Sequence, residues 1–258
     1  MRTTTSADGT PIAYDETGDG PVVVIVNGAM SRAADAAGLA SALTDAGFRA
    51  VTWDRRARGA SGDATGSTPE REVEDLAAVI AATGGEAAVL GHSSGAVLAL
   101  LAASRGVPVS ALFLSEPPMR FGEDEPADDL ADRLQAFVDE GLLDEAIVTF
   151  QLEGVGLPRE MVEGIRASDQ FAALLPLAQS TVYDTNLVRV SSTPSPEMLA
   201  VDAPVTILRG EQTFPLLLTA ADRLAEAMDG AELVVVPESV MHRPDPVATA
   251  RVIRARLA

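Results

Sequence analysis

The first half of the sequence alternates short apolar runs with amphipathic segments, and this alternation limits the fold more than any other feature. The run Val22–Val26 is β-branched and is typical of a strand buried on both faces of a parallel sheet. Further strands are expected over 10–16, 49–53, 87–90 and 110–114, with helices over 31–46, 69–83 and 94–104. Strands joined through helices in this way form right-handed crossovers. The pattern predicts an α/β fold with a mostly parallel sheet flanked by helices.

The middle third of the sequence interrupts this alternation. From Pro117 to about Val201 no run resembles a buried strand, and proline and glycine separate four expected helices over 127–139, 143–150, 159–165 and 171–183. Afterwards the alternation resumes, with strands over 205–208 and 233–236 and helices over 216–228 and 245–257. We therefore expect a core formed by residues 1–116 and 202–258, and an inserted helical cap formed by residues 117–201.

The composition excludes several kinds of catalytic site. The 258 residues include no cysteine and two histidines, and every one of the nineteen basic residues is an arginine. A thiol nucleophile and Cys-ligated zinc are therefore excluded, as are a pyridoxal Schiff base and a P-loop lysine. We expect neither a cofactor nor a metal ion. The acidic run over 123–129 is typical of a solvated helix start rather than of a metal site.

The charge of the chain restricts its partners. A formal net charge of −19 repels phosphate backbones and anionic lipid surfaces, so neither nucleic acid nor membrane is an expected partner. The polar segment 1–16 lacks the layout of a signal peptide, and the apolar runs are too short to span a bilayer. We expect a cytoplasmic protein that binds a small-molecule substrate. The sequence leaves open whether it is a monomer or a homodimer.

The chemistry concentrates in the pentapeptide Gly91-His92-Ser93-Ser94-Gly95. This G-x-S-x-G motif follows an expected strand and opens an expected helix, which is the context of a nucleophile elbow. The sharp turn holds Ser93 at the helix N-terminus, where free amides favour developing negative charge. The amide of Ser94 is then placed to donate to an oxyanion. An ordinary Gly/Ser turn is the alternative interpretation.

A nucleophilic serine needs a base, and neutral histidine is the usual one. His92 lies inside the turn beside Ser93, so we expect its side chain to point elsewhere and to have a structural role. His242 is the remaining candidate, and it follows the last expected strand. The alternative interpretation of His242 is an exposed surface histidine.

These motifs resemble those of the α/β-hydrolase family, and the similarity extends from about Thr10 to Leu257. The segment 53–62, Trp-Asp-Arg-Arg-Ala-Arg-Gly-Ala-Ser-Gly, is similar to the family's D-x-R-G-x-G-x-S loop. Asn27-Gly28-Ala29 stands where the family commonly has His-Gly-x. The resemblance implies that the backbone amides of Ala29 and Ser94 bind the oxyanion, and that Ser93, His242 and a carboxylate form a catalytic triad. Asn27 in place of histidine changes the hydrogen bonding of this loop.

The resemblance leaves the acid of the triad open. Most family members have an aspartate near the position of Thr213, and a threonine cannot stabilise an imidazolium as a carboxylate does. Some members use a carboxylate one strand earlier, and Glu116 lies at that strand's end. We favour Glu116, with Glu211 as the second candidate and with a dyad or another acid as further alternatives. Glu116 could also be a polar residue that simply ends a strand.

Three arginines, Arg55, Arg56 and Arg58, lie close together in the acidic chain. We expect them to pair with local acids such as Asp54 and Asp63 and to brace their loop. The alternative is that they recognise a carboxylate or phosphate group of the substrate.

The whole pattern predicts a serine hydrolase that cleaves an ester, lactone or thioester bond of a small, largely apolar molecule through an acyl-enzyme. The same fold and site could instead serve C–C bond hydrolysis, perhydrolysis or a biosynthetic cyclisation or elimination. A non-catalytic ligand-binding module is a third hypothesis, although a receptor does not need a histidine base.

Overall fold

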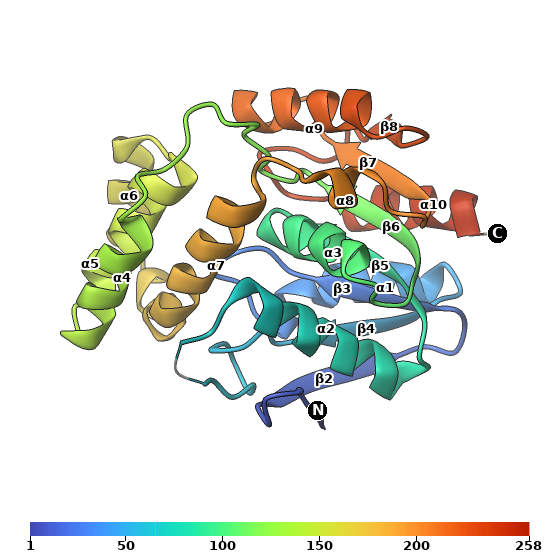
Figure 1. Cartoon of the computed structure of the whole chain (residues 1–258), viewed down its shortest axis with the longest axis horizontal. Coiled ribbons are helices and arrows are strands. Elements are labelled where there is room, and N and C mark those ends of the chain that lie inside the picture. The colour runs from blue at the N-terminus through green and yellow to red at the C-terminus, as the bar shows by residue number, and fades with distance from the viewer. Residues whose placement is uncertain (65, 258) are drawn as a thin grey trace.

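A computed structural model of the chain describes residues 1–64 and 66–257, and eight of its strands form one sheet in the order β1-β2-β4-β3-β5-β6-β7-β8 (Figure 1). The first two strands pair antiparallel, as do β2 and β4, and the other neighbours are parallel. The strands are β1 (Arg2–Thr5), β2 (Pro11–Thr17), β3 (Val22–Val26), β4 (Arg49–Trp53), β5 (Ala87–His92), β6 (Val109–Ser115), β7 (Val205–Arg209) and β8 (Glu232–Val235). The prediction of a mostly parallel α/β sheet is confirmed.

The sequence pattern located seven of these strands but not the edge strand β1. Its residues Arg2–Thr5 are polar and mostly exposed, so the strand has no apolar run that could reveal it. By contrast, β3 and β4 have the bounds that their apolar patterns predict. The sheet edge is therefore defined by backbone pairing with β2 rather than by burial of side chains.

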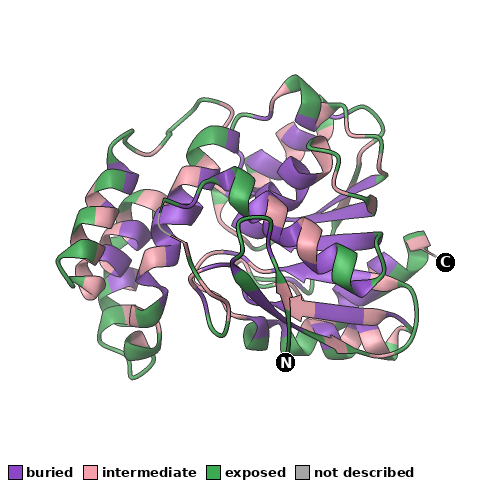
Figure 2. Ribbon diagram, turned by 60° about the horizontal axis from the view of Figure 1, so that its bottom comes forward, coloured by how far each residue is buried: buried purple, intermediate pink, exposed green. Residues whose placement is uncertain are grey.

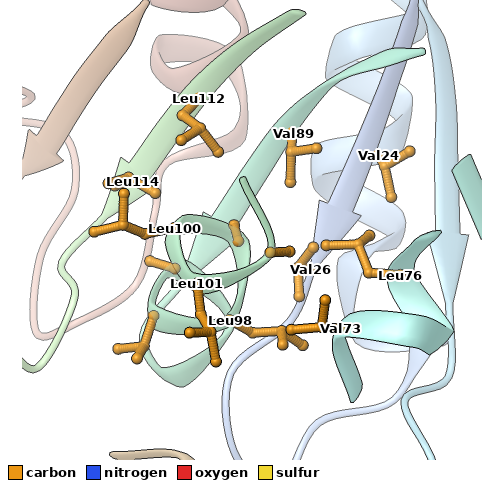
Figure 3. Close-up of a cluster of buried hydrophobic side chains, with 14 of the residues drawn as sticks. Val24, Val26, Val73, Leu76, Val89, Leu98, Leu100, Leu101, Leu112 and Leu114 are labelled. Carbon is orange, nitrogen blue, oxygen red and sulfur yellow. The ribbon is translucent and has the colours of Figure 1, made fainter. Parts of the chain in front are cut away.

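Two apolar layers cover the two faces of the sheet. Alternate residues of β3 divide between them: Val24 and Val26 belong to one layer, and Val23 and Ile25 to the other. The helices α2 (Pro69–Thr83), α3 (Ser94–Ser104) and α9 (Pro215–Ala227) cover the first face, and α1 (Ala37–Asp45) and α10 (Pro246–Leu257) cover the second. Figure 3 shows side chains of the first layer, and Figure 2 shows that buried residues concentrate where helices meet strands.

The stretch between β6 and β7 is helical. The helices are α4 (Leu130–Asp139), α5 (Leu143–Thr149), a π-helix (Phe150–Val155), α6 (Arg159–Arg166), α7 (Ala178–Ser191) and α8 (Pro196–Leu199), and two short 3₁₀ turns (Phe171–Ala173, Leu175–Leu177) precede α7. In Figure 1, α4, α5 and α6 lie together at one side of the molecule, and α7 lies between them and α3. The helices α4, α5 and α7 and the π-helix share an apolar cluster of their own, which includes Leu134, Phe150 and Val182.

The helix expected over 171–183 differs from the structure at both ends. Pro176 lies in the second 3₁₀ turn, and the α-helix begins only at Ala178. The helix then continues to Ser191 through the buried polar residues Asp184 and Thr185. Apolar periodicity could not reveal this extension because most of its buried residues are polar: Asp184, Thr185 and Ser191 are buried alongside Leu187.

The helices of the described chain are too short or too polar to cross a bilayer.

Candidate active site

Ser93 lies in a strained turn between β5 and α3. Its backbone angles, φ 56° and ψ −129°, lie outside the regions that residues with a side chain commonly adopt. Its amide donates to the carbonyl of Ser115, the last residue of β6, over 2.9 Å. The turn is therefore held at the carboxyl end of the sheet, which is where ligands bind in open α/β folds.

Two glycines allow this turn to approach the sheet closely. A Cβ atom on Gly95 would lie 2.1 Å from the carbonyl oxygen of Val26, and one on Gly91 would lie 2.5 Å from the Cα atom of Ala96. Both distances are too short for any side chain. The glycines at the ends of the pentapeptide are therefore required by contact with neighbouring backbone.

The loop after β3 lies against the serine. A Cβ atom on Gly28 would lie 2.8 Å from the Cβ atom of Ser93 and 3.4 Å from its Oγ atom. The side chain of Asn27 donates to the carbonyl of Arg32 over 2.7 Å and so closes the loop. Asn27 thus has a local hydrogen-bonding role, and the Gly28–Ala29 peptide lies next to Ser93.

Glu116 and His242 form a hydrogen-bonded pair. Nδ1 of His242 lies 2.6 Å from Oε2 of Glu116. Glu116 also accepts a hydrogen bond from the amide of Gly210 (2.9 Å) and one from the hydroxyl of Thr213 (3.0 Å). Burial raises the pKa of the Glu116 carboxyl, but the hydrogen bonds from His242, Gly210 and Thr213 outweigh this effect, so the pKa lies below its usual value. Glu116 is therefore an ionised carboxylate in contact with the imidazole.

The structure separates the two candidate acids. Glu116, buried at the end of β6, is within hydrogen-bonding distance of His242, whereas Glu211 is exposed. Thr213, where the family pattern suggests an aspartate, donates to Glu116. Both Glu116 (φ 47°) and His242 (φ 60°) have left-handed backbone conformations, as Ser93 does.

His92 is packed against the second histidine. The two ring centroids lie 4.5 Å apart. Burial lowers the pKa of His92 to about 3, and the neighbouring charge of His242 contributes to this shift. His92 is therefore neutral at physiological pH. Because His92 directly precedes Ser93, its ring contact with His242 links the turn that holds Ser93 to the histidine loop.

The predicted pairing of the loop arginines with Asp54 and Asp63 is wrong. Arg55 binds Glu72 and Asp184, Arg56 binds Asp75 and Asp8, and Arg58 binds Asp184. All three guanidinium groups are buried. Proximity in sequence is a poor guide here because the loop turns its arginines toward acids of α2, 17 and 19 residues later, and toward Asp184 of α7, more than 120 residues later.

Asp54 and Asp63, the predicted partners of the arginines, bind other groups. Asp54 accepts hydrogen bonds from the amides of Ala33 (2.7 Å) and Ala60 (2.9 Å). Asp63 accepts one from the hydroxyl of Tyr183 on α7 (2.9 Å). Both carboxylates thus fasten loops around the site rather than neutralising the arginines.

The acidic run over 123–129 has several partners. Glu123 pairs with Arg223 at 3.0 Å, and Glu125 accepts a hydrogen bond from the hydroxyl of Ser192. Within residues 1–64 and 66–257, no group of three or more His, Asp or Glu side chains is arranged to hold a metal ion.

Asp184 is a site residue that sequence reasoning missed. Its carboxylate accepts hydrogen bonds from the hydroxyl of Ser94 (2.7 Å), from Arg55 (2.9 Å) and from Arg58 (2.6 Å). Nothing in the sequence around Asp184 distinguishes it from the other acids. Only the packing of α7 against α3 brings it to the turn that holds Ser93.

The chain is similar to a described family and to solved structures. The model of the "Alpha/beta hydrolase family" matches residues 23–252. A crystal structure of an alpha/beta hydrolase from Sphaerobacter thermophilus DSM 20745 is 36% identical, with each chain covered over 100% of its length and a TM-score of 0.90. No curated protein sequence matches the chain.

Two more distant structures share the fold alone. One is a thermophilic esterase from Thermogutta terrifontis, with 20% identity, a TM-score of 0.73 and coverage of 99% of this chain and 97% of that chain. The other is the enol-lactonase from Burkholderia xenovorans LB400, with 19% identity, a TM-score of 0.70 and coverage of 99% and 98%.

Proposed function

Because the chain belongs to the α/β-hydrolase family, we propose that it is a serine hydrolase that cleaves an ester, lactone or thioester bond through an acyl-enzyme. Two observations carry the proposal: the strained turn that holds Ser93, and the hydrogen-bonded pair of His242 and Glu116, whose imidazole packs on the ring of His92, the residue before Ser93. A strained serine beside a histidine that a carboxylate orients has the geometry of an activated nucleophile.

In the proposed reaction, Oγ of Ser93 attacks the carbonyl carbon and its proton passes to His242. Glu116 orients the imidazole and stabilises the imidazolium that forms. The amides of Ala29 and Ser94 donate to the oxyanion of the tetrahedral intermediate. The intermediate collapses to the acyl-enzyme when the leaving group takes the proton from His242. A water molecule, deprotonated by His242, then attacks the acyl carbon, and Ser93 departs with the proton.

The helical insertion supports a small, largely apolar substrate. We assign residues 117–201 as a cap over the site, and the apolar cluster of its helices has Ala29 and Met30 packed against it. Met30 follows the proposed oxyanion donor Ala29, so apolar cap residues lie near the reacting carbonyl in this proposal. Such a site would favour a short acyl or ring substrate over a polar one.

The test compares Ser93→Ala with the wild-type protein on p-nitrophenyl esters of two to eight carbons. We expect the variant to lose at least about 1,000-fold in kcat while its circular dichroism and melting temperature stay close to those of the wild type. A fluorophosphonate probe should label the wild type at Ser93 and leave the variant unlabelled. Undiminished ester hydrolysis by the variant would contradict the proposal, and an unlabelled wild-type Ser93 would favour a binding module or non-covalent catalysis.

The same assay compares Glu116→Gln with the matched control Glu211→Gln. We expect the first substitution to lower kcat by about 100- to 10,000-fold, because a neutral amide neither stabilises the imidazolium nor enforces the correct tautomer. The second should leave kcat unchanged. The opposite result would assign the acid of the triad to Glu211.

A further inference from the structure

Two buried arginines and two buried acids form an ion cluster behind the turn that holds Ser93. Arg55 and Arg58 come from the loop after β4, Glu72 from α2 and Asp184 from α7. Each of the four side chains is at most 2% exposed. Burying four charged groups carries a large desolvation cost, and a buried ion pair often stabilises a fold no more than apolar residues of similar size. The contacts of the cluster suggest a different purpose.

Arg58 touches the peptide that carries one proposed oxyanion donor. Its Nη1 atom donates to the carbonyl oxygen of Gly28 over 2.6 Å. In a planar trans peptide this carbonyl points opposite to the N–H of Ala29. A charged donor on the carbonyl therefore fixes the plane of the group and draws electron density from it, which makes the N–H of Ala29 a stronger donor.

Asp184 connects Arg58 to the residue that carries the other donor. Its Oδ2 atom accepts from Nη2 of Arg58 (2.6 Å), and its Oδ1 atom accepts from the hydroxyl of Ser94 (2.7 Å). Arg55 donates to the same Oδ1 atom (2.9 Å) and to the hydroxyl of Ser94 (3.2 Å). One carboxylate thus links the loop after β3 with the first turn of α3.

The charge of Asp184 is maintained by its neighbours. Burial raises the pKa of this carboxyl, but the positive charges of Arg55 and Arg58 and the hydroxyl of Ser94 outweigh burial, so the pKa lies below its usual value. The carboxylate is therefore ionised and can hold both contacts at once. Because Asp184 lies on α7, its contacts with Arg58 and Ser94 also depend on how the helical insertion packs against the rest of the chain.

We propose that Arg58 and Asp184 are positioning residues of the oxyanion hole. Arg58 orients and polarises the Gly28–Ala29 peptide, and Asp184, which binds both Arg58 and Ser94, fixes the position of that peptide relative to Ser94. This inference rests on the proposed function. It predicts that the pair acts on the transition state rather than on substrate binding, because the oxyanion exists only after attack.

The chain offers a matched control in the same loop. Arg56 and Asp75 form a second buried pair, with both side chains at 0% exposure and two contacts of 2.7 Å. Arg56 also contacts Asp8 and the carbonyl of Arg71, which belong to neither donor loop. Loss of this pair should affect folding in a similar way without moving the oxyanion donors.

The experiment compares Arg58→Lys and Asp184→Asn with Arg56→Lys and Asp75→Asn. For p-nitrophenyl butyrate we expect the first two to lower kcat by about 10- to 100-fold with KM changed less than about threefold. A trifluoromethyl ketone of the same chain length, which forms a tetrahedral adduct with the serine, should bind more weakly by the same factor as kcat/KM falls. Inhibition by 1-butanol, which forms no oxyanion, should not change. The control pair should alter only the melting temperature.

Equal losses of kcat in all four variants would overturn the proposal, since the cluster would then only support the fold. If Arg58→Lys and Asp184→Asn do not fold, Ser94→Ala removes the linking hydroxyl and keeps the backbone amide. We expect this variant to lose about 3- to 30-fold in kcat and in ketone affinity, and unchanged values would overturn the proposal. Ser93→Ala is measured in parallel. If that variant keeps its activity, the proposed function fails, and this outcome is distinct from failure of the present inference.

Discussion

At the scale of single residues, the proposed acid of the triad, Glu116, comes from a different strand than the aspartate of the family pattern. Thr213 stands near the position where most relatives would have that aspartate, and its hydroxyl donates to Glu116 instead. Glu116 comes from the neighbouring strand and lies 2.6 Å from Nδ1 of His242. The sequence favoured Glu116 over Glu211 but could not show this contact. An acid at the end of a strand can be assigned a partner only when the neighbouring strand and the loop that carries the histidine are placed beside it.

His92 leads to a prediction about acid stability. Because its pKa is lowered to about 3, the folded chain resists a proton that the unfolded chain takes up below a pKa of 6.5. The free energy of unfolding therefore falls as the pH drops from about 6.5 toward 3, by at most about 1.4 kcal/mol per pH unit from this residue. His92→Gln should flatten that dependence.

The measurement is urea denaturation of both proteins between pH 8 and pH 4. Above pH 7.5 the two curves of unfolding free energy against pH should run parallel, because the imidazole is neutral in both states there. Curves that stay parallel down to pH 4 would show that His92 takes up a proton as readily in the fold as in the unfolded chain.

At the scale of elements, the turn between β5 and α3 depends on close backbone contact. Gly95→Ala would place a Cβ atom 2.1 Å from the carbonyl oxygen of Val26, so we expect a loss of more than about 3 kcal/mol in unfolding free energy. The matched control is Gly164→Ala on the exposed face of α6, where a Cβ atom meets nothing within 4 Å.

The control variant should be stabilised by up to about 1 kcal/mol, because alanine favours a helix more than glycine does. Thermal and chemical denaturation of the two variants check both statements. A Gly95→Ala variant as stable as the wild type would mean that β3 and α3 can move apart without cost.

The helix α7 shows a limit of predicting secondary structure from the sequence. Its apolar residues, such as Val182, indicate a helix, but its polar residues from Asp184 onward do not. Asp184 is buried because Arg55 and Arg58 meet it from a loop more than a hundred residues earlier. Periodicity treats a polar residue as exposed, so a buried ion cluster is invisible to it.

At the scale of the whole molecule, the net charge of −19 leads to a prediction about substrates. A negative field lowers the local concentration of anionic substrates, and salt screens that field. For an ester that carries a carboxylate, kcat/KM should rise by about two- to tenfold between roughly 10 and 150 mM salt. For a neutral ester of the same length it should stay constant. Equal salt dependence of both esters would show that the field does not act at the site.

The sequence by itself determined the fold class and several kinds of catalytic site that this chain cannot contain. Strands that alternate with helices specify a mostly parallel sheet because each helix supplies the crossover that two parallel strands need. The absence of cysteine and lysine removes whole classes of catalyst. The tertiary structure alone decided which acid meets His242, which acids neutralise the loop arginines, and that Asp184 reaches Ser94. These are contacts between residues far apart in the chain, and a pairing of that kind depends on how strands and helices pack rather than on any local pattern.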